Sequence, residues 1–173
     1  MALNNRERIT RAFDLLQEGL YDLVDEVMTR YFRTSDWAER MATQDAQRYG
    51  GGRRRLEKTD PQVQLRAITE YGREFKGELS RGQQSLASEL WETRNKWAHG
   101  NQFSYDDTIR ALDTIERLLR AVNSMDSAND VRKLRENLQR MVYEDRTRKR
   151  SKPTNPASIS ASKGLKPWRE IIH

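Results

Sequence analysis

The sequence predicts an all-α protein, and three observations support this fold class. Hydrophobic residues make up 35% of the 173 positions and charged residues 34%, a balance typical of helices with one solvated face. Only four prolines and nine glycines interrupt the chain. Apolar side chains recur at intervals of three and four residues, which is the period of a helix face. At this length we expect one domain followed by a tail.

The first expected helix spans residues 6–32. Its apolar positions follow one another at steps of four or three residues, so they form a single face. A shorter helix over 36–48 is expected next, with Ser35 as its cap, and the glycine run at 50–52 ends it. The apolar face of the first helix comprises Ile9, Phe13, Leu16, Leu20, Leu23, Val27 and Tyr31.

The third helix is expected to start at "TDPQVQ", with Asp60 as N-cap and Pro61 in the first helical position, where a missing N–H is tolerated. Its apolar face continues through Phe75 to Leu79. Glycines and the "SRGQQS" stretch then predict a kink or short break near residues 80–85. The helix that follows carries Leu86, Leu90, Trp91, Arg94 and Trp97.

Two further helices are expected in the second half of the chain. Ser104, three residues before Asp107, resembles a capping box and starts the first of them. Its inward positions are Ile109, Leu112, Leu119 and Val122. The last helix is expected over 128–148, with Val131, Leu134, Leu138 and Met141 as its apolar face.

The composition changes sharply after this last helix. Residues 150–164 are basic and then rich in Ser, Pro and small side chains, which predicts a flexible linker. Residues 165–173 return to apolar and aromatic character. We therefore expect a helical domain over 1–149, a linker over 150–164, and the start of a following domain at 165–173.

Charge and residue inventory bound the function. Lys and Arg number 32 against 26 Asp and Glu, for a net charge of +6, and 24 of the cations are arginine. Such a balance favours phosphate-bearing partners, although arginines at helical spacing from acids also serve as solvated ion pairs. Without cysteine, disulfides and thiolate chemistry are excluded. No secretory signal or membrane span is evident, so we expect a cytoplasmic protein.

The stretch "ELWETRNKWAHG" contains the only internal histidine, His99, five residues after Arg94. On a helical wheel Arg94 falls within the apolar sector defined by Leu86, Leu90 and Trp97. An arginine there needs a partner or a ligand, because an unpaired buried charge costs several kcal/mol. It either pairs with an acid of a neighbouring helix, such as Asp106 or Asp107, or lines a groove, or does both.

His99 lies about 140° from Arg94 on that wheel, so the two side chains diverge in a continuous helix, where His99 shares a face with Asn95. Two arrangements bring Arg94 and His99 together. Either the helix ends near Trp97, with Gly100 in the left-handed conformation, or a second subunit supplies the complementary group. A histidine in this position also commonly serves as a helix C-cap. For chemistry, imidazole can accept the 2′-hydroxyl proton of RNA while arginine grips phosphate.

The region "ELWETRNKWAHGNQFSYDDTIRALDTIERLLRAV" resembles the signature of the HEPN superfamily. Its ribonucleases carry Arg, a polar residue, three more residues and His, which are matched here by Arg94, Asn95 and His99. The resemblance is closest to the branch named after a yeast nuclear endoribonuclease, and covers about residues 5–148. In prokaryotes that branch stands at the front of large ATPase-like proteins associated with phage defence, and "LKPWREII" resembles the start of such an ATPase-like region.

The resemblance implies an up-and-down bundle of four to six helices that forms a two-fold homodimer. It also implies metal-independent cleavage of single-stranded RNA, without a cofactor, that leaves a 2′,3′-cyclic phosphate. By position, Arg94 would hold phosphate, His99 would act at the 2′-hydroxyl, and Asn95 would orient them. Some members of the superfamily are non-catalytic assembly or RNA-binding modules, and this alternative remains open.

Two further groups complete the candidate site. Arg53, Arg54 and Arg55 follow the glycine run, and with Lys96 they are candidate contacts to the RNA backbone, although solvated loop charge explains them equally well. The glycine run is not a phosphate-binding P-loop, since the Gly-Lys-Ser/Thr ending is missing. Trp91 and Trp97 are interpreted as core or dimer-interface anchors rather than base-stacking platforms. We assign no metal ligand.

Overall fold

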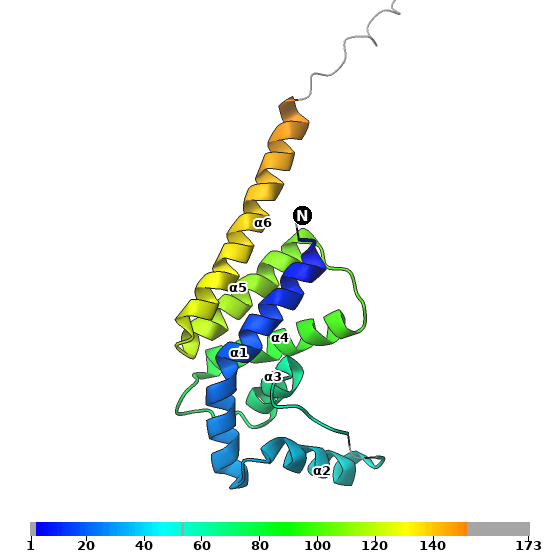
Figure 1. The fold of residues 1–173 in the computed structure, drawn as a ribbon, viewed down its shortest axis with the longest axis vertical. Coiled ribbons are helices and arrows are strands. Elements are labelled where there is room, and N and C mark those ends of the chain that lie inside the picture. The colour runs from blue at the N-terminus through cyan, green and yellow to red at the C-terminus, as the bar shows by residue number, and fades with distance from the viewer. Residues whose placement is uncertain (1–2, 53, 152–173) are drawn as a thin grey trace, which may run out of the picture. The chain divides into compact units, whose positions relative to one another are not determined.

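The computed structural model describes residues 3–52 and 54–151, which form six α-helices and no strand. Figure 1 shows how these helices follow one another along the chain. The all-α prediction is confirmed for this part of the chain. By compactness the chain divides into two units, residues 1–139 and 140–173, which are described separately. The helices are α1 (Asn5–Phe32), α2 (Trp37–Tyr49), α3 (Pro61–Glu70), α4 (Arg81–Ala98), α5 (Tyr105–Ala121) and α6 (Met125–Ser151).

Four helices of the first unit form the bundle. The long helix α1 packs against both α3 and α5, and α4 packs against the same two helices from the other side (Figure 1). The shorter helix α2 contacts α1. The centre of the bundle is apolar, and each fully buried aliphatic side chain there contributes about 1.5–3 kcal/mol. Side chains with no exposed surface include Ile9, Leu16, Leu20, Ile68, Leu90, Leu112 and Ile115.

Helix α1 follows most of the predicted face. Asn4 and Glu7 form a capping box at its start, and Ile9, Leu16 and Leu20 are fully buried. Beyond Leu20 the buried positions are Val24, Val27 and Met28, so the predicted Val27 is confirmed. The predicted Leu23 is only partly buried, and Tyr31, in the last turn of the helix, is 44% exposed.

The predicted start of α2, end of α3 and start of α4 were wrong. Helix α2 starts after Asp36 rather than Ser35, and the Asp36 side chain makes no capping hydrogen bond. Helix α3 ends at Glu70, so the break covers residues 71–80 instead of 80–85. Ser80 then forms a capping box with Gln83, which starts α4 where a break was predicted. The apolar periodicity misled here because Phe75 and Leu79 are buried from a turn segment rather than from a helix.

The starts of α3 and α5 agree with the sequence. Asp60 accepts a hydrogen bond from the Gln62 amide at 2.8 Å, with Pro61 in the first turn of α3. At α5, Ser104 and Asp107 form the predicted capping box. The Ser104 hydroxyl and amide hold the pKa of Asp107 below its usual value, which keeps the capping carboxylate ionised.

Helix α6 starts three residues before the predicted position, after Asn123 has adopted a left-handed conformation with φ of 60°. Its residues 140–151 lie in the second unit, where they are helical, so the helix includes the first two residues of the predicted linker. The rest of that linker and the expected following domain at 165–173 lie outside the described residues. No helix in the described part of the chain has the length and apolar character needed to cross a membrane.

Candidate functional site

The motif lies in the last turns of α4, and the local sequence determines how this helix ends. Gly100 has φ of 76°. Its amide donates to the Trp97 carbonyl, and the Asn101 amide donates to the Lys96 carbonyl, both at 3.2 Å. These two hydrogen bonds and the left-handed residue form a Schellman motif. Of the two arrangements considered from the sequence, the structure has the helix end near Trp97, and His99 is the C-cap residue of α4.

Arg94 is largely buried and faces α3. Its side chain is 15% exposed, and Nη2 lies 3.4 Å from Oδ1 of Asp60. The guanidinium carbon also lies 4.8 Å from the centre of the Trp97 ring, in a cation–π arrangement. Of the alternatives open for Arg94, pairing with an acid of a neighbouring helix is present in the structure. The expected partners, Asp106 and Asp107, were wrong, because these acids belong to the exposed first turn of α5 while Arg94 is turned toward α3.

Asn95 contacts the same end of α3. Its Oδ1 accepts a hydrogen bond of 3.3 Å from the side-chain amide of Gln62, two residues after Asp60. Two adjacent residues of the motif are thus both in contact with the first turn of α3. The N-cap prediction had identified Asp60 only as a helix start, and Gln62 was not singled out.

Trp97 anchors the end of α4 to α1 of the same chain. Its indole N–H donates to the Thr10 hydroxyl at 3.0 Å, and its ring meets Phe13 edge-on with centroids 6.5 Å apart. The guanidinium carbon of Arg6 lies 5.0 Å from the centre of the Trp97 ring, so the ring has a second cation–π contact in addition to that of Arg94. These contacts agree with the interpretation of Trp97 as an anchor within the domain.

Trp91 lies six residues before Trp97 on α4 and lines a hollow of about 640 Å³ between α2, α3 and α4, together with Tyr49 and Gln62. Its indole N–H is buried and has no hydrogen-bond partner among the described residues. A single chain does not test whether Trp91 or Trp97 belongs to a dimer interface, so that assignment stays a prediction.

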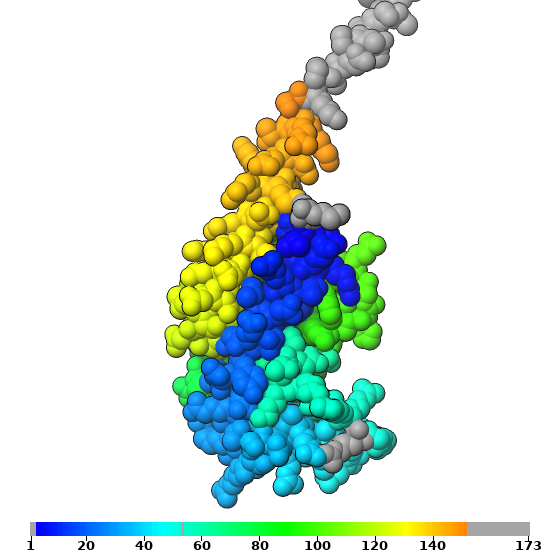
Figure 2. Space-filling view, in the orientation of Figure 1, coloured from blue at the N-terminus to red at the C-terminus, as the bar shows by residue number. Residues whose placement is uncertain are grey.

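The segment that carries His99 is hydrogen-bonded to the first turn of α1 both before and after His99. Arg6 donates to the carbonyl of Trp97 at 2.8 Å, and the Asn5 side chain donates to the carbonyl of Phe103 at 3.0 Å. Figure 2 shows the first turn of α1 lying against this segment at the surface. His99 is exposed between the two ties, and its imidazole forms no hydrogen bond or ion pair with the part of the chain that the structure describes.

Within one chain, Arg94 and Asn95 of α4 both contact the start of α3. The side chain of His99 forms no hydrogen bond with either of them. Its backbone amide donates to the Asn95 carbonyl, as the last turn of the helix requires. The Arg94 side chain faces the interior and that of His99 faces solvent. This divergence agrees with the helical wheel.

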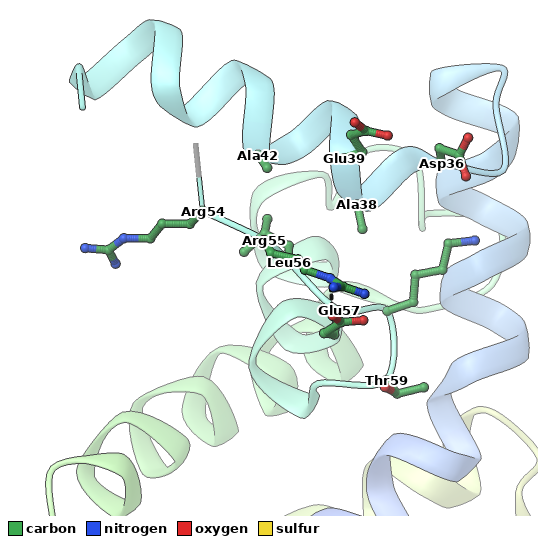
Figure 3. A pocket seen from close by; sticks show the side chains of 10 residues that line it. Asp36, Ala38, Glu39, Ala42, Arg54, Arg55, Leu56, Glu57 and Thr59 are labelled. Atoms are coloured by element: carbon green, nitrogen blue, oxygen red, sulfur yellow. Dashed lines mark ion pairs between the residues drawn. The ribbon is translucent and has the colours of Figure 1, made fainter. Parts of the chain in front are cut away.

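The predicted basic contacts are spread over separate surfaces. Arg54 and Arg55 line a hollow of about 650 Å³ between α2 and the loop 54–59, as Figure 3 shows. Arg54 points away from the other side chains there, whereas Arg55 pairs with Glu57 at 2.7 Å. Lys96 is exposed and lines a different hollow with Asn101 and residues of α5. Arg53 lies outside the described residues.

Several residues that support the motif were missed by sequence reasoning. Asn5, Arg6, Thr10 and Gln62 each contact a residue of the motif segment from 33 to 98 positions away. No spacing rule reports contacts of this kind. Among residues 3–52 and 54–151, no group of three or more His, Asp or Glu side chains is placed to hold a metal ion.

Comparison with known families decides the assignment of the fold. The profile of the Swt1-like HEPN family matches residues 11–123, which include the motif and helices α2 to α5 in full. The chain belongs to the Swt1-like HEPN family. Neither the curated proteins nor the solved structures contain a significant match. The HEPN assignment agrees with the helical bundle.

Proposed function

We propose that this HEPN domain is a metal-independent endoribonuclease that cleaves single-stranded RNA. His99 takes the proton of a 2′-hydroxyl, and the resulting O2′ attacks the adjacent phosphorus. The bond from phosphorus to the 5′ oxygen breaks, that oxygen takes up a proton, and a 2′,3′-cyclic phosphate remains. Arg94 binds the phosphate oxygens, and the developing negative charge strengthens this contact in the transition state.

The observation that carries the proposal is the environment of Arg94. A structural arginine in a bundle interior normally has its donors satisfied, yet the guanidinium of Arg94 makes one hydrogen bond, at 3.4 Å, within the described chain. Its other donors are available to a ligand. An exposed imidazole follows at the helix end, and the chain belongs to the Swt1-like HEPN family.

A homodimer completes the site in this proposal. Arg94 and His99 diverge within one chain, so a second copy related by a two-fold axis supplies the complementary residue across one groove. Trp91, whose ring lines a hollow beside α4, is proposed as part of that interface together with Trp97. Arg54, Arg55 and Lys96, with Arg53, contribute a positive potential that draws RNA and makes its binding sensitive to salt.

The wider role rests on the resemblance alone. We propose that the domain is the N-terminal effector of a larger prokaryotic defence protein, whose ATPase-like region controls cleavage.

The test is cleavage of end-labelled single-stranded RNA by the purified chain in the presence of EDTA, with the products analysed for a terminal cyclic phosphate. Arg94→Ala and His99→Ala should each reduce the rate by at least about 100-fold. Arg40→Ala, an exposed arginine of α2, is the matched control and should leave the rate unchanged. Absence of a cyclic phosphate product with the wild-type chain near neutral pH would refute the proposal.

One observation favours a second candidate, a non-catalytic module for dimerisation or RNA binding. Arg94 already has a carboxylate neighbour, Asp60, as a purely structural arginine would. This alternative predicts that Arg94→Ala lowers the stability of the domain without a cleavage activity to lose. Measuring unfolding and cleavage on the same variants separates the two candidates.

A further inference from the structure

The first turn of α3 holds two adjacent residues of the motif through two different side chains. Asp60 contacts Arg94, and Gln62 contacts Asn95. The same Asp60 oxygen also caps α3 by accepting from the Gln62 amide at 2.8 Å. The carboxylate is thus fixed by its own helix before it meets Arg94, so it presents a defined acceptor rather than a mobile charge.

The guanidinium of Arg94 is restrained in two directions. The Trp97 ring, 4.8 Å from its central carbon, supports its face, and Asp60 contacts one edge at Nη2. A planar group held by its face and one edge has little freedom to rotate, and arginine loses little further entropy when it then binds a phosphate. Trp97 is itself held by Thr10.

We propose that Asp60 and Gln62 are positioning residues of the ribonuclease site, with Asp60 aligning Arg94 and Gln62 aligning Asn95. This inference rests on the proposed function. It extends the site from the end of α4 to the start of α3, a segment 34 residues away from Arg94. Neither residue touches the RNA: both act through the motif side chain that they contact.

The proposal has a kinetic consequence that distinguishes it from a structural role. A carboxylate beside Arg94 repels an RNA phosphate, so its removal tightens binding of RNA in the ground state, by roughly two- to fivefold. Its removal also lets the guanidinium rotate, which lowers kcat by about 10- to 100-fold. Loss of folded protein alone would lower kcat without tightening binding.

The substitutions are chosen to keep the helix cap. Serine caps a helix as well as aspartate does, but its shorter side chain and neutral hydroxyl do not reach Arg94, so Asp60→Ser isolates the second contact. Asp60→Asn keeps the acceptor in place and removes the charge, and it should retain more of kcat than Asp60→Ser. Gln62→Ala removes the donor to Asn95. Asp36→Ser, at the N-cap of α2, makes the same change where no capping bond and no motif contact exist.

The experiment has two measurements. The first is the steady-state rate of RNA cleavage, with binding measured separately on an uncleavable 2′-O-methyl RNA oligonucleotide. The expected result is a lower kcat with tighter binding for Asp60→Ser, a lower kcat for Gln62→Ala, and wild-type values for Asp36→Ser. An unchanged kcat in both Asp60→Ser and Asp60→Asn would overturn the inference, as would a kcat that rises when the charge is removed.

The second measurement does not depend on cleavage. The Nε–H group of Arg94 gives an NMR signal whose relaxation reports how ordered the side chain is on the ps–ns timescale. We expect this order to fall in Asp60→Ser and to be unchanged in Asp36→Ser. If the wild-type chain does not cleave RNA, the proposed function fails, and equal order of Arg94 in both variants would independently contradict the positioning role of Asp60.

Discussion

Replacing Trp97 with leucine should destabilise the domain by about 2–4 kcal/mol. The substitution removes the hydrogen bond to Thr10, worth about 1 kcal/mol, and the edge contact with Phe13, worth about 0.5–1.5 kcal/mol. It also removes the cation–π contacts of Arg6 and Arg94, worth about 0.5–1 kcal/mol each where the ring is partly exposed. These terms share one ring and are not independent, so we expect less than their full sum.

Urea unfolding followed by far-UV circular dichroism measures this loss, since the substitution itself changes tryptophan fluorescence. With a slope of about 2 kcal/mol per molar urea, the midpoint should fall by about 1–2 M. Thr10→Val removes only the hydrogen bond and should lower stability by about 1 kcal/mol. Trp97→Phe keeps an aromatic face for Arg94, so its loss of stability should lie between those of Thr10→Val and Trp97→Leu. A midpoint of Trp97→Leu equal to that of the wild type, with loss of dimer mass in sedimentation, would show that Trp97 anchors a partner subunit instead.

Two further predictions concern the bundle that carries the site. Gly19→Ala should lower the stability of the domain by about 1–3 kcal/mol in thermal unfolding, because an added Cβ would lie 2.3 Å from the fully buried Leu119. The control Gly82→Ala, at the open start of α4, should raise stability slightly. A Gly19→Ala variant more stable than the wild type would refute the packing of α1 against Leu119. Hydrogen bonds from Arg66 hold the pKa of Asp45 below its usual value. The ionised Asp45 therefore stabilises the folded state fully above about pH 4, the pKa of the unfolded chain, and this stabilisation is lost as the pH falls through the lower pKa of the folded state. Asp45→Asn should therefore cost about 1.5–3 kcal/mol at neutral pH, and the difference from wild type should shrink below pH 4, a convergence that acid titration of unfolding measures.

The helix starts illustrate how far local sequence reaches. Asp60 with Pro61, and Ser104 with Asp107, predicted the first residues of α3 and α5, because capping is decided by hydrogen bonds within three or four residues. The end of α3 was not predicted. Phe75 and Leu79 continue the helical spacing of apolar residues, and only their burial in the bundle shows that a turn segment delivers them to the core.

The candidate site divides in the same way. The end of α4 with a left-handed Gly100 was one of two arrangements that the sequence allowed, because a glycine after a helix can adopt a positive φ at no steric cost. The partner of Arg94 did not follow from the sequence. Sequence reasoning recognised that an arginine among apolar positions needs a partner, but it chose acids near in sequence, in the first turn of α5.

Tertiary structure alone decided that Arg94 and Asn95 meet the start of α3, and that Asn5 and Arg6 hold the segment that carries His99. It also decided whether alanine at Gly19 raises or lowers the stability of the domain, at a position where helix propensity by itself favours alanine. Propensity, capping and periodicity are properties of a few neighbouring residues. Contacts between helices depend on the angle and rotation at which they cross, and many side chains of the whole bundle set those together.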